Sequence, residues 1–263
     1  MRIGFAANPL KEGALQTRDS LLRLTAERGI GHVLITDAAA LLQEPRPVDI
    51  LVVVGGDGSL LRYADAASSL KIPLLGVNLG RIGFLSELSE QAFPDALDRL
   101  LEGAYTIERR MMLRCTINEE APLYCLNDIV VFKRTFSGVT EINIQINGAE
   151  VGTVFCDGVI AATPTGSTAY SLSAGGSILA DGLDAISVTT VCPHTLHIRP
   201  IVTAADADIR FSVADSGIVS VDGMRIHEVH RGDSIRVTGA SRTTDFIRFG
   251  KSDLFRLIHE KLS

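Results

Sequence analysis

The chain has 263 residues, of which 46% are hydrophobic and 21% are charged, and its formal net charge is −6. This composition is typical of a globular protein with room for two domains, and it excludes a disordered chain. The negative charge argues against nucleic acid or an acidic membrane as the main partner, because both are bound by concentrated Lys and Arg.

The first hundred residues alternate between short apolar runs and amphipathic helical patterns. The predicted strands cover residues 2–7, 32–36, 49–54 and 73–77. The predicted helices cover residues 13–28, 37–43, 59–70 and 89–102, with Asp37 and Ser89 as caps. This alternation predicts a parallel, doubly wound α/β domain, in which ligands bind beyond the carboxyl ends of the strands. The segments 55–58 and 78–83 both follow such strand ends.

After Tyr105 the pattern changes to short apolar runs separated by turn signals such as Asn147-Gly148 and Asp222-Gly223. The runs that predict strands cover residues 109–118, 123–132, 139–146, 150–156, 159–163, 186–191, 209–213, 218–221, 234–238 and 245–249. We therefore expect an α/β domain over 1–104, a predominantly β domain over 105–249, and a closing helix within 250–263 that packs back onto the first domain.

Targeting signals and cysteine clusters are not evident in the sequence. No run of about 18 apolar residues predicts a membrane span, and the N-terminal residues read directly as a strand rather than as a signal peptide. The cysteines contain no Cys-x-x-Cys pair, so neither a zinc cluster nor a disulfide framework is indicated; they are Cys115, Cys125, Cys156 and Cys192. A cytoplasmic location is the simplest expectation.

The most informative motif is Gly55-Gly56-Asp57-Gly58, between a buried-strand run and a predicted helix. Glycine amides can approach a phosphate closely, and the start of a helix adds free N–H groups. A carboxylate repels phosphate, so Asp57 fits such a loop as a ligand of a sugar hydroxyl, as the base for that hydroxyl or as a metal ligand. The alternative is an ordinary strand-to-helix turn.

A second motif covers residues 157–177, where small and hydroxyl-bearing side chains surround Tyr170. Such a segment can offer backbone amides, hydroxyl groups and an aromatic stacking face to one ligand. The alternative is a Ser/Thr-rich loop between strands. The apolar strand before the segment and its scarcity of charge favour an ordered wall of a binding site.

Together with Asn78-Leu79-Gly80-Arg81-Ile82-Gly83-Phe84-Leu85 and Leu126-Asn127-Asp128, these motifs resemble the NAD kinase family in order and spacing. The resemblance implies transfer of a phosphoryl group from a nucleoside triphosphate or polyphosphate to the 2′-hydroxyl of the adenosine ribose of NAD, with Mg²⁺ on the donor. It also implies a homodimer or homotetramer. The glycine loop alone is shared with lipid and sugar kinases, so these are one alternative, and a dinucleotide sensor without catalysis is another.

The resemblance gives each matching residue an expected role. Asp57 is the expected proton acceptor, and Gly55, Gly56 and Gly58 form the expected phosphate loop. The residues expected to bind NAD are Asp57, Gly58, Arg62, Phe84, Asn127, Asp128, Asp157, Thr168, Ala169, Tyr170, Ser171, Leu172, Ser173 and Cys192. No metal site made by the chain's own side chains is expected.

Three positions depart from the family pattern. Asp128 stands where Glu is usual, which shortens the reach to ribose by one methylene group. Phe155 stands where many members carry a basic side chain, so a phosphate contact there is not expected and the donor preference stays open. Met224 follows Asp222-Gly223 where Gln is common, which weakens any polar role there. None of these departures touches Asp57.

Overall fold

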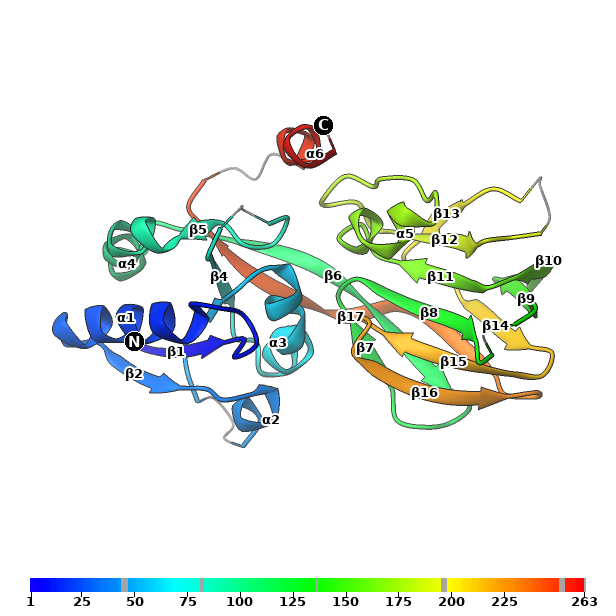
Figure 1. Ribbon diagram of the computed structural model, residues 1–263, viewed down its shortest axis with the longest axis horizontal. Helices are drawn as coiled ribbons and strands as arrows, with labels where there is room; N and C mark the ends of the chain where they lie inside the picture. The colour runs from blue at the N-terminus through cyan, green and yellow to red at the C-terminus, as the bar shows by residue number, and fades with distance from the viewer. Residues whose placement is uncertain (44–46, 81–82, 136, 195–197, 251–253, 263) are drawn as a thin grey trace. The chain divides into compact units, whose positions relative to one another are not determined.

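The structure is a computed structural model that describes all residues except 44–46, 81–82, 136, 195–197, 251–253 and 263. It divides into two units, with residues 1–109 and 244–263 in unit 1 and residues 110–243 in unit 2. The predicted fold class, an α/β domain followed by a β-rich domain and a final helix, is confirmed by the order of the elements (Figure 1).

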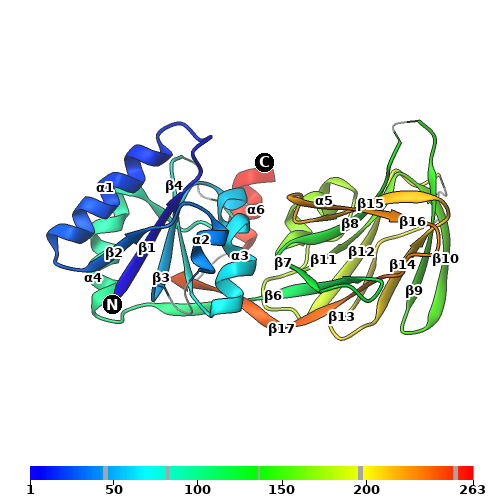
Figure 2. The ribbon, with the colours of Figure 1, turned by 90° about the horizontal axis from the view of Figure 1, so that it is seen from below.

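Unit 1 is built around a parallel sheet with the strand order β4-β3-β1-β2. These strands are β1 (Arg2–Ala7), β2 (Gly31–Leu34), β3 (Ile50–Val54) and β4 (Leu74–Asn78). The short β5 (Leu88–Ser89) pairs with β4. The helices α1 (Ala14–Glu27) and α4 (Phe93–Leu101) lie on one face of the sheet, and α2 (Ala38–Leu41) and α3 (Asp57–Leu70) lie on the other (Figure 2).

Helices cover both faces of the sheet because successive apolar side chains of each strand point to opposite faces. Alternate residues of β1 and β3, including Phe5 and Val52, pack with α1 and α4 in one hydrophobic core. In that core the rings of Phe5 and Phe93 meet edge to face, with centroids 6.2 Å apart. Gly76 of β4 faces the opposite side, where a Cβ would stand 2.7 Å from Leu60 of α3. The strands β1, β3 and β4 are therefore buried on both faces, as strands of parallel sheets generally are, whereas β2 at the edge is largely exposed.

Two predicted helix caps have different outcomes. Asp37 caps α2 as predicted, since its side chain accepts a hydrogen bond of 2.7 Å from the amide of Ala40. The prediction of Ser89 as the cap of the next helix is wrong, because its side chain makes no capping hydrogen bond. A short 3-10 turn, η1 (Glu90–Ala92), follows instead, and α4 begins at Phe93 with a proline in its first turn, where no amide donor is needed.

The closing helix is α6 (Leu254–Leu262), which belongs to unit 1. The ammonium nitrogen of Lys261 lies 4.6 Å from the centre of the Phe84 ring. Residues 251–253 of the predicted helix lie outside the described residues. No helix among the described residues is both long enough and apolar enough to cross a membrane.

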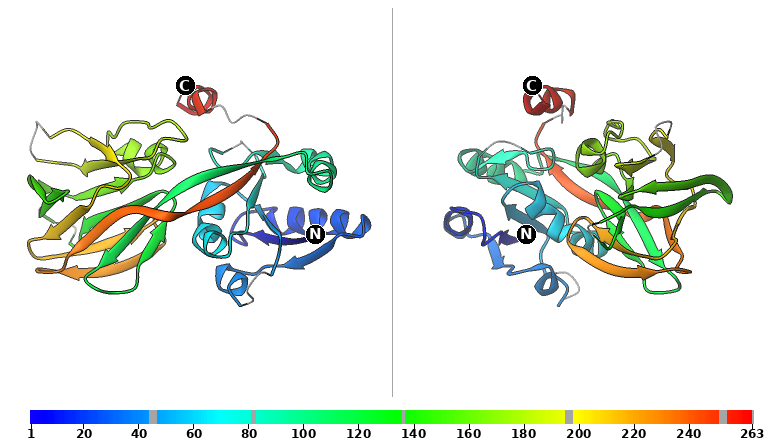
Figure 3. Two further views of the ribbon diagram at one scale, coloured as in Figure 1. Left: turned by 180° about the vertical axis from the view of Figure 1, so that it is seen from behind. Right: turned by 45° about the vertical axis from the view of Figure 1, so that its right-hand side comes forward.

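Unit 2 contains two sheets. The six-stranded antiparallel sheet has the order β13-β12-β11-β8-β15-β16, from β13 (Ile201–Ala204), β12 (Ala185–Val191), β11 (Gly158–Ala162), β8 (Asp128–Lys133), β15 (Ser216–Val221) and β16 (Arg225–His230). The second sheet of the unit includes β10 (Ala149–Cys156), β9 (Thr140–Ile146), β14 (Ile209–Val213), β7 (Leu123–Cys125) and parts of β6 (Thr106–Ile117) and β17 (Ile235–Arg248). The paired strands β6 and β17 contribute residues to both units (Figure 3).

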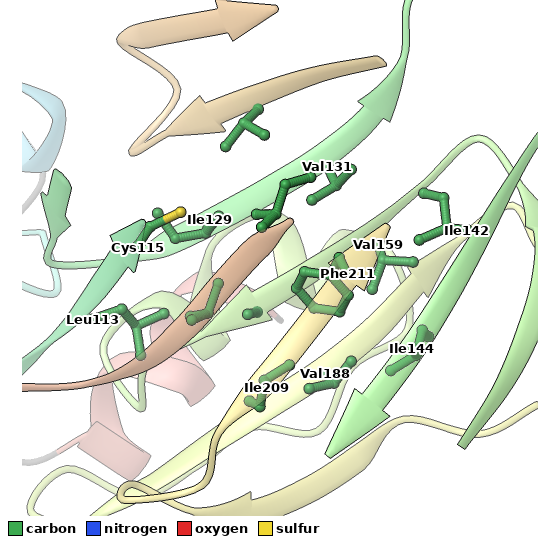
Figure 4. Close-up of a cluster of buried hydrophobic side chains, with 14 of the residues drawn as sticks. Leu113, Cys115, Ile129, Val131, Ile142, Ile144, Val159, Val188, Ile209 and Phe211 are labelled. Atoms are coloured by element: carbon green, nitrogen blue, oxygen red, sulfur yellow. The ribbon is translucent and has the colours of Figure 1, made fainter. Parts of the chain in front are cut away.

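One hydrophobic core joins the inner faces of these two sheets (Figure 4). Phe211 of β14, from one sheet, is buried in this core together with Val159 of β11 and Val188 of β12 from the other. The opposite face of β11 carries Ile160 and Ala162, which form a separate small cluster with neighbouring strands. The strand β11 is therefore buried on both faces, with the core between the sheets on one side and this small cluster on the other.

The strand predictions need three corrections. The run 123–132 is interrupted at Leu126 and Asn127, so it forms β7 and β8. The runs 234–238 and 245–249 belong to one continuous strand, β17. The strands β13 and β16 were not predicted, and β16 has a polar sequence, Arg-Ile-His-Glu-Val-His, that lacks a strong apolar signal.

Candidate functional site

The glycine loop joins β3 to α3 in unit 1. The helix begins at Asp57 rather than at the predicted Ser59, because the carbonyl of Gly56 already accepts hydrogen bonds from the amides of Ser59 (2.8 Å) and Leu60 (3.4 Å). Gly55 has a φ of 149°, and a Cβ there would stand 2.2 Å from the Ser59 hydroxyl oxygen. Both the backbone conformation and the close approach therefore require glycine at position 55.

The carboxylate of Asp57 is held by the loop that follows β4. Its Oδ2 atom accepts a hydrogen bond of 2.8 Å from the amide of Phe84. Its Oδ1 atom accepts from the amides of Leu85 (3.1 Å) and Ser86 (3.3 Å), and from the Ser86 hydroxyl group (3.5 Å). The structure thus brings together the two motifs that follow β3 and β4, and fixes the Asp57 side chain between them.

Gly83 and Ser86 make this arrangement possible. A Cβ on Gly83 would stand 1.9 Å from Asp57 Oδ1, so only glycine leaves room for the carboxylate. The Ser86 hydroxyl oxygen accepts from the Asn78 side-chain amide (3.1 Å) and from the Gly83 amide (3.0 Å). The motif around Gly83 had been recognised, whereas the role of Ser86 had no local signal in the sequence.

The other expected site residues of unit 1 lie around this loop. Gly58 is the second residue of α3, and nothing lies within 4 Å of a Cβ built there. Arg62 lies about one turn further along α3 and is exposed. Phe84 is half-buried, and its amide is the donor to Asp57.

In unit 2, Asn127 and Asp128 stand at the start of β8, next to the end of β11. The segment after β11 packs closely on them, since the Thr163 amide donates to the Asn127 carbonyl (2.9 Å) and the Thr163 hydroxyl donates to the Leu126 carbonyl (2.6 Å). A Cβ on Gly166 would stand 2.0 Å from the Asn127 carbonyl oxygen. The sequence motifs 126–128 and 163–169 are therefore joined in one local structure.

Asp222 supports the same backbone, a role that the sequence analysis missed. Its carboxylate accepts from the amides of Leu126 (2.9 Å), Asn127 (2.7 Å) and Asp128 (3.2 Å). The Asp222-Gly223 pair was read only as a turn signal, and it does form the β15–β16 turn, with φ values of 52° and 68°. Asn127 Oδ1 is buried without a hydrogen-bond partner among the described residues, so it can accept from a ligand.

Two carboxyl groups in this region titrate at unusual pH. Burial raises the pKa of Asp128 to about 7, and the charge of Asp222 adds to this shift. Burial also raises the pKa of Asp222, although the three amide donors and Arg225 act in the opposite direction. Asp128 is therefore a mixture of neutral and ionised forms near pH 7 and can both donate and accept a hydrogen bond there.

The hydroxyl-rich segment forms η2 (Gly166–Thr168) and α5 (Tyr170–Ser173), and α5 lies against β11 (Figure 1). Tyr170 is 41% exposed. Burial raises its pKa, and the charges of Cys192, Asp157 and Asp128 raise it further, so its hydroxyl group lies within electrostatic reach of all three.

The remaining side chains of the segment differ in their surroundings. Ser171 is buried and its hydroxyl group pairs with that of Thr189 at 3.2 Å. The Thr168 hydroxyl donates to the Thr165 carbonyl at 3.1 Å. Ala169 and Leu172 are half-buried and Ser173 is exposed. Ser171 and Thr168 therefore already have internal partners for their hydroxyl groups.

Asp157 and Cys192 lie at the other end of β11. Asp157 precedes Gly158 and Thr163 follows Ala162, so the two ends are separated by about 20 Å at roughly 3.3 Å per residue. The Lys133 ammonium group lies 2.5 Å from Asp157 Oδ1, an ion pair that sequence reasoning missed. Cys192 is exposed with a φ of 47°. Asp157 and Cys192 thus lie at the opposite end of β11 from Asp128, and the Tyr170 hydroxyl group is influenced by charges at both ends.

Two of the residues that depart from the family pattern, Phe155 and Met224, are exposed. Phe155 in β10 is 48% exposed and its carbonyl accepts from the His194 amide at 2.8 Å. Met224, in the β15–β16 turn, is 41% exposed. Within the described part of the chain, no group of three or more His, Cys, Asp or Glu side chains is placed to hold a metal ion.

Comparison with protein families supports one assignment. Residues 34–105 match the ATP-NAD kinase N-terminal domain, and residues 126–249 match the ATP-NAD kinase C-terminal domain. An NAD kinase of Moorella thermoacetica is 40% identical over 99% of this chain and 89% of its own length. An NAD kinase of Heliobacterium modesticaldum is 37% identical over 99% of this chain and 98% of its own length.

Two solved structures share the fold. The yeast NADH kinase complexed with NADH has a TM-score of 0.89 and 23% identity, over 100% of this chain and 87% of that one. The NAD kinase from Archaeoglobus fulgidus in complex with ATP has a TM-score of 0.82 and 24% identity, over 100% of this chain and 98% of that one. The resemblance inferred from the motifs is confirmed by the domain matches and the relatives, and the chain is an enzyme that belongs to the NAD kinase family.

Proposed function

We propose that the chain transfers the γ-phosphoryl group of ATP to the 2′-hydroxyl group of the adenosine ribose of NAD, with Asp57 as the proton acceptor. The observation that carries this proposal is the Asp57 carboxylate, fixed by three backbone amides beside a glycine loop. The relatives named as NAD kinases and the similar folds solved with NADH and with ATP support the same substrates.

The two oxygens of Asp57 differ in their capacity to accept another hydrogen bond. Oδ1 accepts from Leu85, Ser86 and the Ser86 hydroxyl group, whereas Oδ2 accepts only from Phe84 among the described residues. A carboxylate oxygen can accept two hydrogen bonds. Oδ2 therefore has room for the ribose hydroxyl group, which it would orient and deprotonate.

The proposed step transfers one proton to Asp57 and one phosphoryl group to the ribose. The proton of the 2′-hydroxyl group passes to Asp57, and the bond between O2′ and the γ-phosphorus forms. The bond between that phosphorus and the bridging oxygen of the β-phosphate breaks, and ADP leaves with the electron pair. Because such transfers depend mainly on positioning and charge neutralisation, the amides of Gly56 and Gly58 and the cation of Arg62 would contribute at the phosphates. The Gly55 amide is not available for this role, because it donates to the Val77 carbonyl at 2.8 Å.

We propose that residues of unit 2 hold the NAD molecule. Asn127 Oδ1 would accept from a ribose hydroxyl group or an amide, and Tyr170 would stack on a ring of the ligand. Asp128 would contact ribose directly or through water. The other proposed contacts are Phe84 of unit 1 and Asp157, Thr168, Ala169, Ser171, Leu172, Ser173 and Cys192 of unit 2.

A divalent cation, Mg²⁺ by preference, would accompany the donor. Mg²⁺ is usually bound through one or two carboxylates together with substrate phosphates. The carboxylate nearest the glycine loop, Asp57, is already engaged by amides, which fits a cation carried mainly by the phosphates. When bound, the cation would neutralise charge on the transferred group.

We also propose that the protein is cytoplasmic and forms a homodimer or homotetramer. Light scattering would test the oligomeric state.

The test of the proposed base is the variant Asp57→Asn. With purified protein, NAD, ATP and Mg²⁺, the wild-type chain should form NADP, and the variant should lose about 10²- to 10⁴-fold in kcat. Asp65→Asn, on the same helix but outside the loop, is the matched control and should keep its activity. An Asp57→Asn enzyme that retains most of its rate would refute the assigned role.

The donor and the redox state of the acceptor need a separate measurement. Rates with ATP, other nucleoside triphosphates and polyphosphate should be compared, with NAD and NADH side by side in each case. We expect ATP and NAD to give the highest kcat/KM. A clear preference for polyphosphate or for NADH would redefine the substrates while leaving the role of Asp57 intact.

A further inference from the structure

The loop between β1 and α1, residues 8–13, leaves the sheet next to the glycine loop. The strands β1 and β3 are parallel neighbours, with Ala7 opposite Val54. The Asn8 amide continues this pairing, since it donates to the Val54 carbonyl at 3.4 Å. Both loops therefore begin at the same edge of the sheet, and the first of them had no role in the sequence analysis.

This loop places the side chain of Lys11 beside the glycine loop. The Lys11 ammonium nitrogen lies 3.6 Å from the point where a Cβ on Gly56 would stand. The loop backbone is fixed by local hydrogen bonds: the Asn8 carbonyl accepts from the Lys11 amide at 3.1 Å, and the Lys11 carbonyl accepts from the Ala14 amide at 3.1 Å. The position of Lys11 follows from these turns and not from a long flexible segment.

The charge of Lys11 is not neutralised within the described part of the chain. Its ammonium group makes no hydrogen bond or ion pair with the described residues, although the side chain is partly buried. The carboxylate closest in sequence to Gly56, that of Asp57, accepts hydrogen bonds from the loop 84–86 instead. A cation in these surroundings is suited to an anion that arrives from solution, because a partly buried charge is stabilised by a partner.

We propose that Lys11 binds the phosphate chain of the donor, an assignment that rests on the function proposed above. The ammonium group would stay protonated and act as a point charge, while the amides of the glycine loop bind the same phosphates. Together with Arg62, it would also offset the repulsion between the donor and the Asp57 carboxylate.

The test compares Lys11→Met with Lys11→Arg and with Arg23→Met, which removes one exposed cation from α1. We expect Lys11→Met to raise the KM for ATP by about ten- to a hundredfold, the range for one charged hydrogen bond, with the KM for NAD unchanged. Calorimetry with inorganic triphosphate should show the same rise in Kd. Lys11→Arg should recover most of the affinity, and Arg23→Met should match the wild type.

Each contrary result has a defined meaning. An unchanged KM for ATP and an unchanged Kd for triphosphate in Lys11→Met would overturn the assignment, and so would an increase confined to the KM for NAD. Should Lys11→Met fail to fold, Lys11→Gln provides the same loss of charge. A wild-type chain that binds triphosphate but forms no NADP would refute the proposed function, while the calorimetric comparison would still decide the role of Lys11.

Discussion

The carboxyl groups of Asp57, Asp128 and Asp222 have different surroundings, and these decide what each can do. The carboxylates of Asp57 and Asp222 each accept hydrogen bonds from three backbone amides, so each links two separate stretches of chain. Asp128 is buried and its side chain makes no hydrogen bond with the described residues. Asp57 and Asp222 are thus fixed in place, whereas the Asp128 carboxyl is buried without such donors, and its burial raises its pKa to about 7.

The buried carboxyl of Asp128 should make stability depend on pH. Its pKa is about 7 in the folded chain, against about 3.9 for an unfolded chain, so the folded state holds a proton that the unfolded state releases. The resulting stabilisation is complete below about pH 4 and is lost as the pH rises through 7. Asp128→Asn should therefore gain Tm relative to the wild type as the pH increases from 5 to 8, measured by scanning calorimetry.

The control for this prediction is Asp206→Asn, an exposed carboxyl in the same unit. The difference in Tm between this variant and the wild type should stay constant over the same pH range. A constant difference for Asp128→Asn as well would show that its carboxyl is ionised throughout, contrary to the raised pKa.

Gly83 provides a second test at single-residue scale. A Cβ at this position would stand 1.9 Å from Asp57 Oδ1, so Gly83→Ala should displace the carboxylate and lower kcat by about 10²-fold. Gly80→Ala in the same loop is the matched control, because nothing lies within 4 Å of a Cβ there. Steady-state kinetics should be used to measure kcat for both variants, and their Tm values should be compared to check that both fold. Equal activity of the two variants would contradict the tight fit around Asp57.

Helix caps and loops show which parts of the fold and of the candidate site can be predicted from the sequence. Asp37, at the start of an apolar run, identifies its helix because its cap is a local interaction. The glycine loop was also recognisable, since its residue types have a direct chemical reason. The contacts of Asp222 with residues 126–128 and of Ser86 with Asp57 were missed because the partners lie far apart in sequence, and a local pattern carries no information on such contacts.

The strand β17 shows that a local sequence pattern can also fail to predict the extent of a whole strand. Gly239 and its small neighbours suggest an end of the strand, so two strands were predicted where one continues. The glycine is present for a tertiary reason: its amide donates to the Ala205 carbonyl at 2.7 Å, and a Cβ would stand 2.6 Å from that oxygen. Close approach of another backbone, rather than termination, explains this residue.

Gly239→Ala should consequently destabilise the chain. The added methyl group cannot fit against the Ala205 carbonyl without a shift of the backbone, which should lower the free energy of unfolding by about 1–3 kcal/mol. Ser241→Ala, at an exposed position of the same strand, is the control and should change little. Urea denaturation followed by circular dichroism measures both. A Gly239→Ala chain as stable as the wild type would mean that the strand can move away from Ala205.

At the scale of the whole molecule, the chain has two separate principal cores. Phe93 is buried in the core of unit 1 and Phe211 in the core of unit 2. Only the strands β6 and β17 contribute residues to both units in the described chain. Unfolding of such a chain need not be two-state, because each unit can lose its packing by itself.

Phe93→Ala and Phe211→Ala should therefore have local effects. Each substitution should cost about 3–5 kcal/mol in its own unit, through lost burial and the cavity left behind. Limited proteolysis with the cleavage sites mapped by mass spectrometry should show new cuts within residues 1–109 and 244–263 for the first variant and within residues 110–243 for the second. Cuts spread evenly over both units in either variant would show that the two cores unfold together.

The hydrogen bonds to Asp57 have a further consequence for observing the site without turnover. The amide hydrogens of Phe84, Leu85 and Ser86 are held by one carboxylate, so their exchange with solvent reports whether that side chain is in place. In the proposed mode of binding, a ribose hydroxyl group at Oδ2 would share that oxygen, among the described residues, with the Phe84 amide alone. Nuclear magnetic resonance signals of these three amides would thus distinguish occupation of the site, seen at Phe84, from opening of the loop, seen at all three.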